Sequence, residues 1–183
     1  MLVEGDDSWM FQIPGTSLVQ KQAELCGCEW LGISTQGIQE EEIFDLEKEL
    51  QNLQIDGIVS GALRSDYQKT RLERMAERLG IKSFTPLWHQ SSQSHMEGLV
   101  ANGFKVMITG VSSEGLGKEW LGHIIDSESL KELQSLATKY RFHVDGEGGE
   151  YETIVVAGPH MTDSLNLDFK THWDGVRGHL IFV

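Results

Sequence analysis

The sequence predicts an α/β protein with a helix-rich front half and a strand-rich back half. Up to residue 90, short apolar segments alternate with helical patterns, which is typical of parallel strands joined by crossover helices. Beyond Arg141, three strand patterns follow one another with no helix between them. We therefore expect two lobes, 1–90 and 91–183.

Each element of the front half has a local signal. Apolar residues at spacings of three and four predict a helix over 39–53. The stretch 56–62 is an apolar strand that ends in Gly-Ala, and a helix from Ser65 to Leu79 follows it, as in one half of a parallel crossover unit. The other expected elements are the end of a strand at 1–3, a loop at 4–15, a helix from Thr16 or Ser17 to Leu25, and strands at 29–33 and 81–85.

The back half begins with a helix that Ser91 or Ser92 caps and that ends near residue 102. Residues 104–111 form the most continuous apolar run of the chain, which predicts a buried strand. Ser127 or Ser129 is expected to cap a helix that ends near Tyr140. The strand patterns that follow cover 151–156, 164–172 and 176–183.

Charge and cysteine content exclude several classes of protein. The chain has 15 Lys and Arg and 28 Asp and Glu, which gives a net charge of −13. This charge argues against direct nucleic-acid binding, because Lys and Arg supply the attraction to the phosphate backbone. No segment approaches the run of about 18 apolar residues that spans a bilayer, and no leader pattern is present, so we expect a cytoplasmic protein. Cys26 and Cys28 are too close for an unstrained disulfide and lack a second ligand pair for zinc, so we expect reduced, structural thiols.

An acidic, glycine-rich stretch carries the strongest chemical signal. It reads Gly146-Glu147-Gly148-Gly149-Glu150-Tyr151-Glu152-Thr153. Glycine permits a sharp turn or a close approach to a ligand. In a strand that starts at Glu150, Glu150 and Glu152 share one face, and Tyr151 and Thr153 share the other. The alternative interpretation is a solvated acidic turn that enters an edge strand.

The turn that follows strand 56–62 is a second candidate, because ligands gather at the carboxyl ends of parallel strands. The segment reads Gly61-Ala62-x-x-Ser65-Asp66-Tyr67-Gln68-x-x-Arg71. The simpler interpretation is a capped helix in which Arg71 pairs with Asp66 or Glu73 on the surface.

These two motifs resemble those of the diphthine–ammonia ligases, within the N-type ATP pyrophosphatase group, and the resemblance covers essentially the whole chain. Weaker support comes from Pro86-Leu87-Trp88, Glu114-Gly115-Leu116 and Trp120-Leu121-Gly122. The resemblance implies a Rossmann-like sheet of the adenine-nucleotide hydrolase type in 1–90 and a smaller α+β substrate lobe in 91–183. It implies that the nucleotide is bound by Gly61, Ala62, Ser65, Asp66, Tyr67, Gln68 and Arg71, with Arg71 or Lys69 near its phosphates. It implies that the substrate is bound by Glu114, Glu147, Gly148, Gly149, Glu150, Glu152 and Thr153.

The reaction implied by the resemblance is the ATP-dependent amidation of diphthine on translation elongation factor 2. ATP activates the carboxylate as an acyl-adenylate and releases pyrophosphate, and ammonia from ammonium then displaces AMP. Diphthine carries a trimethylammonium cation, which Glu147, Glu150 and Glu152 would attract and to which Tyr151 or a Trp would add a cation–π contact. Mg²⁺ is expected with the phosphates of ATP. No catalytic residue or metal ligand is assigned, and the oligomeric state stays open, a homodimer included.

One family feature is absent from the sequence. The group begins with a first strand and a Ser-Gly-Gly-x-Asp-Ser loop that holds the pyrophosphate of ATP, and Ser-Gly-Gly occurs nowhere here. Met1 falls where the family's second strand would be ending. Either the true start lies upstream or the loop is lost. We expect an upstream start, because losing a central strand would leave apolar edges open; the chain as given is expected not to complete adenylation.

Two other functions stay open. A different ATP pyrophosphatase-type enzyme would share the motifs, although sulfur transfer needs a reactive cysteine, and Cys26 and Cys28 are far in sequence from both motifs. The other open function is a non-catalytic binding module that lost the nucleotide loop.

The seven histidines show no His-x-x-x-His spacing, so structural or exposed roles are expected. The tryptophans are expected to pack, with Trp88 and Trp120 as candidates to line a cleft.

Overall fold

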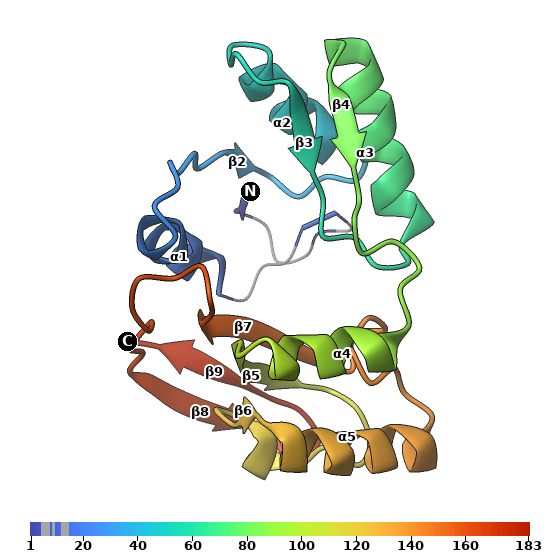
Figure 1. Ribbon diagram of the computed structural model, residues 1–183, viewed down its shortest axis with the longest axis vertical. Coiled ribbons are helices and arrows are strands. Elements are labelled where there is room, and N and C mark those ends of the chain that lie inside the picture. Colours follow the sequence, from blue (N-terminus) through green and yellow to red (C-terminus); the bar gives the residue numbers. More distant parts are fainter. Residues whose placement is uncertain (5–7, 9, 12–14) are drawn as a thin grey trace. The chain divides into compact units, whose positions relative to one another are not determined.

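The computed structural model describes residues 1–4, 8, 10–11 and 15–183 (Figure 1). Most of the loop expected at 4–15 therefore lies outside the described residues. The chain forms two compact units: the first contains Met1–Ser17 and Leu31–Gln90, and the second contains Leu18–Trp30 and Ser91–Val183. None of the helices in the described part combines the length and the apolar character needed to cross a bilayer.

The first unit contains parallel strand pairs and two helices. Its elements are β1 (Leu2–Val3), β2 (Ser34–Thr35), α2 (Glu42–Leu50), β3 (Gly57–Val59), α3 (Asp66–Leu79) and β4 (Lys82–Phe84). β1 pairs with β2 and β3 pairs with β4, both in parallel. The predicted crossover from strand through helix to parallel strand is thereby confirmed. Met10, Ile43 and Met75 form the buried centre of this unit.

Local signals account for most boundaries of the first unit. The Ser65 side chain accepts a hydrogen bond from the Gln68 N–H and caps α3, and Gly80 ends that helix at a φ of 69°. The strand expected at 29–33 is wrong, because the ladder to β1 begins only where the Leu2 N–H donates to the Ile33 carbonyl. Leu31 is exposed, so this apolar residue has no sheet to pack against.

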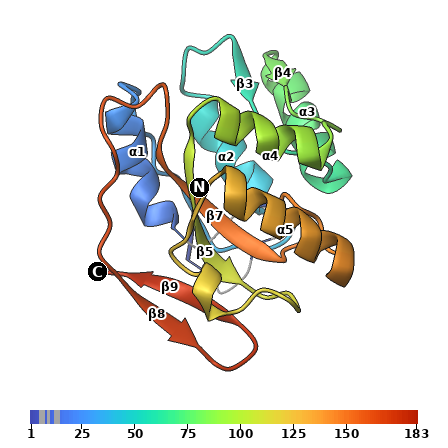
Figure 2. The ribbon, with the colours of Figure 1, turned by 60° about the horizontal axis from the view of Figure 1, so that its bottom comes forward.

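The second unit is an antiparallel sheet with helices. Its elements are α1 (Val19–Leu25, after the 3-10 turn Thr16–Leu18), α4 (Ser92–Ala101), β5 (Lys105–Val111), the 3-10 turn Lys118–Trp120, β6 (Ile124–Ile125), α5 (Ser127–Tyr140), β7 (Tyr151–Ala157), β8 (Phe169–Trp173) and β9 (Gly178–Phe182). β5 is central: β7 pairs along one edge, and β6 and β9 pair with different parts of β5 (Figure 2). β8 pairs with β9 at the end of the sheet.

The core of the second unit forms around β5, whose Ile108 is fully buried, as the long apolar run predicts. α4 and α5 contribute Met96 and Leu133 to the same cluster. α1 also belongs here, because Leu25 packs against this cluster and the Gln22 side-chain amide donates to the Val155 carbonyl at 2.7 Å. The segment 18–30 therefore packs with the second unit rather than with residues 1–90, the lobe in which we expected it.

Two further boundaries differ from the sequence analysis. Asp126, not Ser127 or Ser129, caps α5: its carboxylate accepts from the Ser129 N–H, and the Ser129 hydroxyl oxygen accepts in return from the Asp126 N–H. β8 begins at Phe169 rather than at 164, because its ladder to β9 starts there.

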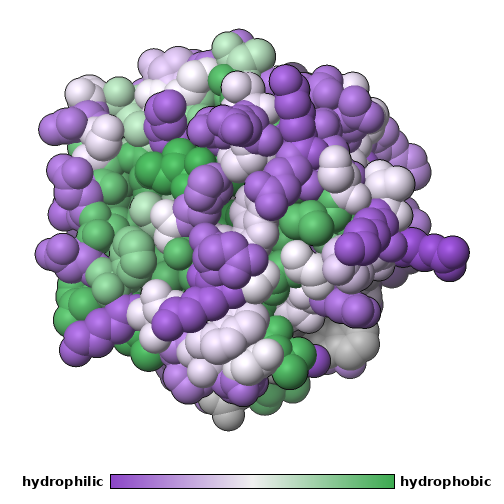
Figure 3. Space-filling view, turned by 90° about the horizontal axis from the view of Figure 1, so that it is seen from below, coloured by the Kyte–Doolittle hydropathy of each residue, from purple (hydrophilic) through white to green (hydrophobic). Residues whose placement is uncertain are grey.

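Cys26 and Cys28 have free thiols, as expected, but both side chains are exposed. The structural role that we expected for these two thiols is therefore wrong. On the face shown in Figure 3, hydrophilic residues are interspersed with hydrophobic ones.

Candidate functional site

The acidic glycine-rich stretch forms a tight turn that leads into β7. Gly146 and Gly149 have φ angles of 72° and 79°, and the Gly149 N–H donates to the Gly146 carbonyl at 2.9 Å. A Cβ atom on Gly146 would lie 2.7 Å from the carbonyl oxygen of Tyr151. Glycine is thus required at 146 both by backbone conformation and by space.

Contacts from two other segments hold this turn. Ser112, which follows β5, donates its N–H to the Glu150 carbonyl at 2.9 Å and its hydroxyl to the Gly149 carbonyl at 2.5 Å. The Tyr151 hydroxyl donates to the Val144 carbonyl at 2.5 Å. The turn is therefore anchored on the loop after β5 and on the loop after α5. Sequence reasoning missed Ser112, because its role depends on pairing between β5 and β7.

Glu150 has one oxygen in a structural contact and one without a partner. Its Oε1 accepts a hydrogen bond from the His143 N–H at 2.8 Å. Its Oε2 is buried and has no hydrogen-bond partner among the described residues. Buried carboxylate oxygens are nearly always hydrogen-bonded or paired with a charge. This oxygen is consequently a candidate acceptor for a cationic or hydrogen-bonding ligand.

Glu152 lies inside β7, where it pairs with Gly110 of β5. It is partly buried, and this burial raises the pKa of its carboxyl. The Gly110 position has no side chain, so the Glu152 side chain lies against it: a Cβ there would be 3.4 Å from Glu152 Cβ and Cγ. Thr153 pairs with Ile108 on the same strands.

Tyr151 does not line an open cation site. It is 4% exposed, and its ring belongs to the core of the second unit. Burial, with the negative charges of Asp145 and Glu150, raises the pKa of the Tyr151 hydroxyl. The cation–π role expected for this residue is therefore wrong. The reason is the period of the strand: Tyr151 is the first residue of β7, and its side chain packs into the core.

The other residues predicted for the substrate lie on loops. Glu147 and Gly148 are part of the turn, Glu147 partly buried and Gly148 exposed. Glu114 is exposed and lies two residues beyond Ser112, the residue that anchors the turn. Gly115 next to it has a φ of 90°, and a Cβ there would lie 2.3 Å from the Tyr140 ring. The Glu114 loop is thus shaped by close packing against α5.

In the first unit, two hydrogen bonds hold the turn after β3. The Ser60 N–H donates to the Phe84 carbonyl, and the Ala62 N–H donates to the Ser60 hydroxyl at 3.2 Å. Gly61 and Asp66 are exposed. Gln68 points elsewhere, because its side-chain amide donates to the Met10 carbonyl at 3.1 Å. Among the residues predicted to bind the nucleotide, Gln68 therefore uses its side-chain amide in a contact within the protein.

Arg71 is also engaged. Its Nε donates to Glu40 Oε2 at 3.1 Å, its Nη2 donates to Glu40 Oε1, and its guanidinium stacks 3.3 Å from the centre of the Tyr67 ring. The hydrogen bond from Arg71 lowers the pKa of Glu40. The surface pairing expected with Asp66 or Glu73 is wrong in its partner, since Lys69 takes Glu73. Sequence reasoning missed Glu40 because it belongs to a different segment.

Trp88 and Trp120, the two tryptophans that were candidates to line a cleft, lie in different surroundings. Trp120 is buried in the core of the second unit, so it does not line a cleft. Trp88 stacks on His89 with ring centres 4.7 Å apart, and the Lys69 ammonium lies 5.3 Å from the Trp88 ring centre. In the described part of the chain, no three His, Cys, Asp or Glu side chains gather as a metal site.

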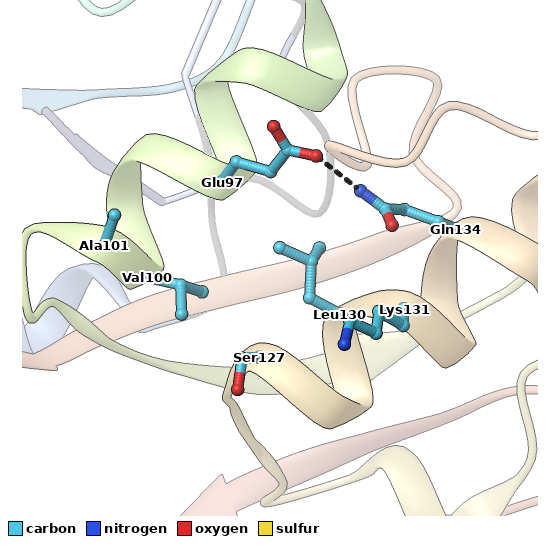
Figure 4. Close-up of a pocket in the computed structure, with 7 residues that line it drawn as sticks. All are labelled: Glu97, Val100, Ala101, Ser127, Leu130, Lys131 and Gln134. Carbon is cyan, nitrogen blue, oxygen red and sulfur yellow. Dashed lines mark hydrogen bonds between the residues drawn. The ribbon is translucent and has the colours of Figure 1, made fainter.

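A groove of about 300 Å³ lies between α4 and α5. Figure 4 shows Val100 and Leu130 facing each other across it, with the Gln134 amide donating to Glu97 at 3.3 Å at one end. The groove contains none of the residues predicted for either site. All the predicted nucleotide residues belong to the first unit, and all the predicted substrate residues belong to the second.

Both halves of the chain match models of one protein family. A model described as the diphthamide synthase N-terminal domain matches residues 1–83, and a model described as the diphthamide synthase C-terminal domain matches residues 91–182.

Curated relatives carry a consistent name. The chain is 30% identical to the diphthine–ammonia ligase of Mus musculus over 185 residues, which covers 91% of this chain and 68% of that protein. It is 29% identical to the Danio rerio protein of that name over 178 residues, covering 88% and 69%. The Schizosaccharomyces pombe protein is 31% identical over 129 residues, but the match covers only 21% of its length.

Proposed function

This chain belongs to the diphthamide synthase family, and we propose that it acts in the ATP-dependent amidation of diphthine on translation elongation factor 2. The substrate carboxylate is a poor electrophile, because its leaving group would be oxide. Transfer of AMP from ATP releases pyrophosphate and gives an acyl-adenylate. Ammonia then attacks the acyl carbon, AMP leaves, and the nitrogen loses a proton to give the amide.

The observation that supports this proposal most directly is the state of Glu150. A carboxylate oxygen that has no hydrogen-bond partner within the described part of the chain, held in a turn that is anchored at Ser112, suits the permanent trimethylammonium cation of diphthine. A trimethylammonium group has no N–H to donate, so charge attraction and close apolar contact must provide its binding. Glu147 and Glu152 belong to the same turn and strand, and they add negative charge.

The nucleotide is proposed to bind at the turn after β3 and the start of α3. Parallel pairing of β3 with β4 supports a Rossmann-like sheet, in which ligands lie at the carboxyl ends of the strands. Arg71 is the cation proposed for the phosphates, and Asp66 and Ser65 line the helix N-terminus. Mg²⁺ would neutralise the phosphate oxygens, with most of its ligands coming from the nucleotide and water.

A coupled assay tests the proposed function. The chain, and the same chain extended by any in-frame codons upstream of Met1, is mixed with ATP, isotopically labelled ammonium and elongation factor 2 that carries diphthine. Label in the diphthine amide together with stoichiometric AMP supports the proposal. AMP without labelled amide indicates a different ATP pyrophosphatase substrate. Elongation factor binding without AMP or amide from either form indicates a binding module.

A further inference from the structure

Two histidines face each other across the β8–β9 hairpin. His172 is the register partner of His179, so their side chains project from the same face of the sheet. β9 alternates between buried and exposed residues, and His179 is on its exposed face. His172 is exposed as well. The centres of the two imidazole rings are 5.0 Å apart, with the ring planes inclined by 43°.

That separation fits two imidazoles on one metal ion. A Zn–N bond of about 2.0–2.1 Å places the centre of each imidazole about 3.2 Å from the ion. At a tetrahedral N–Zn–N angle, the two ring centres are then about 5 Å apart. We propose that His172 and His179 form a two-histidine binding site for a divalent transition metal such as Zn²⁺. Imidazole is a preferred ligand of this class, whereas Mg²⁺ and Ca²⁺ prefer oxygen.

The hairpin holds the two histidines in register before any metal binds. The Asp174 carboxylate accepts from the Val176 and Arg177 N–H groups at 2.8 and 2.7 Å, and the Asp174 N–H donates to the Arg177 carbonyl at 3.0 Å. These contacts close the turn between β8 and β9. Binding therefore requires reorientation of two side chains rather than rearrangement of the backbone.

The site leaves coordination positions open. Among the residues described, no third His, Cys, Asp or Glu joins a group that could hold a metal, so water or an external donor completes the coordination. Gly110 of β5 pairs with both His179 and Glu152, which places these residues on one row across the sheet. A donor bound to the metal would therefore lie on the same face as Glu152. The metal site itself does not depend on the proposed ligase reaction.

The test uses tag-free protein in a Cys26→Ser/Cys28→Ser background, because two exposed thiols would also bind Zn²⁺. Calorimetric titration with Zn²⁺ is expected to show one saturable site with a Kd of about 10 μM, as two ligands give modest affinity. His172→Gln and His179→Gln should each weaken binding about tenfold or more, as expected when one of two protein ligands is lost. His143→Gln and His160→Gln, at exposed histidines outside the hairpin, are the matched controls and should leave the Kd unchanged.

A second measurement needs no histidine variant. In the Cys26→Ser/Cys28→Ser protein, sub-stoichiometric Zn²⁺ should shift or broaden the imidazole NMR signals of His172 and His179 before those of the other histidines. The proposal is overturned if Zn²⁺ does not saturate a site below millimolar concentration. It is also overturned if either hairpin variant retains the parent Kd, or if Mg²⁺ competes equally with Zn²⁺.

Discussion

Arg71 and Glu40 are 31 residues apart in the chain and form a two-contact ion pair, in which Nε and Nη2 of the arginine each donate to a different carboxylate oxygen. Glu40 has a φ of 69°, a conformation that non-glycine residues seldom adopt. Arg71 also covers the Tyr67 ring. If Arg71 binds phosphate, the Glu40 carboxylate is the group that the phosphate displaces.

The first prediction concerns this pair. Arg71→Gln should weaken ATP binding about tenfold or more, because a charge-assisted contact to phosphate is lost. Glu40→Gln should strengthen ATP binding by about fivefold at most, since exposed ion pairs are weak and their displacement costs little. Fluorescence titration with a labelled ATP analogue measures both.

Arg78 supplies a matched control for Arg71. Arg78 also lies on α3, and it pairs with Glu47 of α2. Its Nε is 3.0 Å from each carboxylate oxygen of Glu47. Arg78→Gln should leave ATP affinity unchanged. Equal losses in Arg71→Gln and Arg78→Gln would show that helix integrity, not phosphate contact, explains the first result.

The second prediction separates the two oxygens of Glu150. Glu150→Gln keeps an acceptor for the His143 N–H, so its free energy of unfolding should change little, while affinity for tetramethylammonium falls about tenfold. Glu150→Ala should lose the same affinity and also about 1–3 kcal/mol of stability, because the acceptor is gone. Urea denaturation and calorimetric titration separate these effects. Glu119→Gln, an exposed acid outside the turn, is the control, and unchanged tetramethylammonium affinity in Glu150→Gln would remove Glu150 from the cation site.

The third prediction compares two glycines of the turn. Gly149→Ala adds a Cβ that meets nothing within 4 Å, so only its positive φ is strained, which costs about 1–2 kcal/mol. Gly146→Ala adds the same strain and a contact of 2.7 Å with a backbone oxygen. It should lose about 3 kcal/mol or more. Similar denaturation midpoints for the two variants would contradict the described turn.

The fourth prediction follows from the raised pKa of Glu152. The folded state holds this proton more tightly than the unfolded chain, so the resulting stability is fully present below about pH 4.3, the pKa of an unperturbed Glu. It is lost as the pH rises through the raised folded pKa. Glu152→Gln should therefore be more stable than the parent at pH 7, and this advantage should disappear near pH 4. Urea denaturation at both pH values checks this, with the exposed Glu114→Gln as control; an advantage that does not change with pH would exclude Glu152 as its source.

Local sequence signals predicted the parts of the fold that depend on local physics. Ser65, Ser91 and Gly80 mark helix ends because capping and a left-handed glycine act within one turn. The parallel β3–β4 pair and the buried β5 followed from hydrophobic pattern. The packing of α1 with the second unit could not be predicted, because it depends on contacts such as Gln22 to Val155 across 133 residues.

For the candidate site too, the sequence predicted only those features whose residues are neighbours in the chain. The acid-glycine turn was recognised because its chemistry is contiguous in sequence. The pairing of Arg71 with Glu40 and the anchoring of Gly149 by Ser112 were not recognised. Both contacts join residues that are far apart in sequence and meet only through tertiary structure. Tyr151 was assigned to a ligand because its type suits a cation, whereas its position at the start of β7 directs it into the core.

The most direct test of the account is whether one reaction mixture couples ATP cleavage to amide formation on diphthine. With ATP, labelled ammonium and diphthine-bearing elongation factor 2, mass spectrometry of the diphthine residue should show label in the amide, with one AMP formed per amide. Glu150→Gln should reduce that yield about tenfold at limiting substrate. An unlabelled diphthine carboxylate after exhaustive incubation, with the chain and its upstream-extended form alike, would contradict the account.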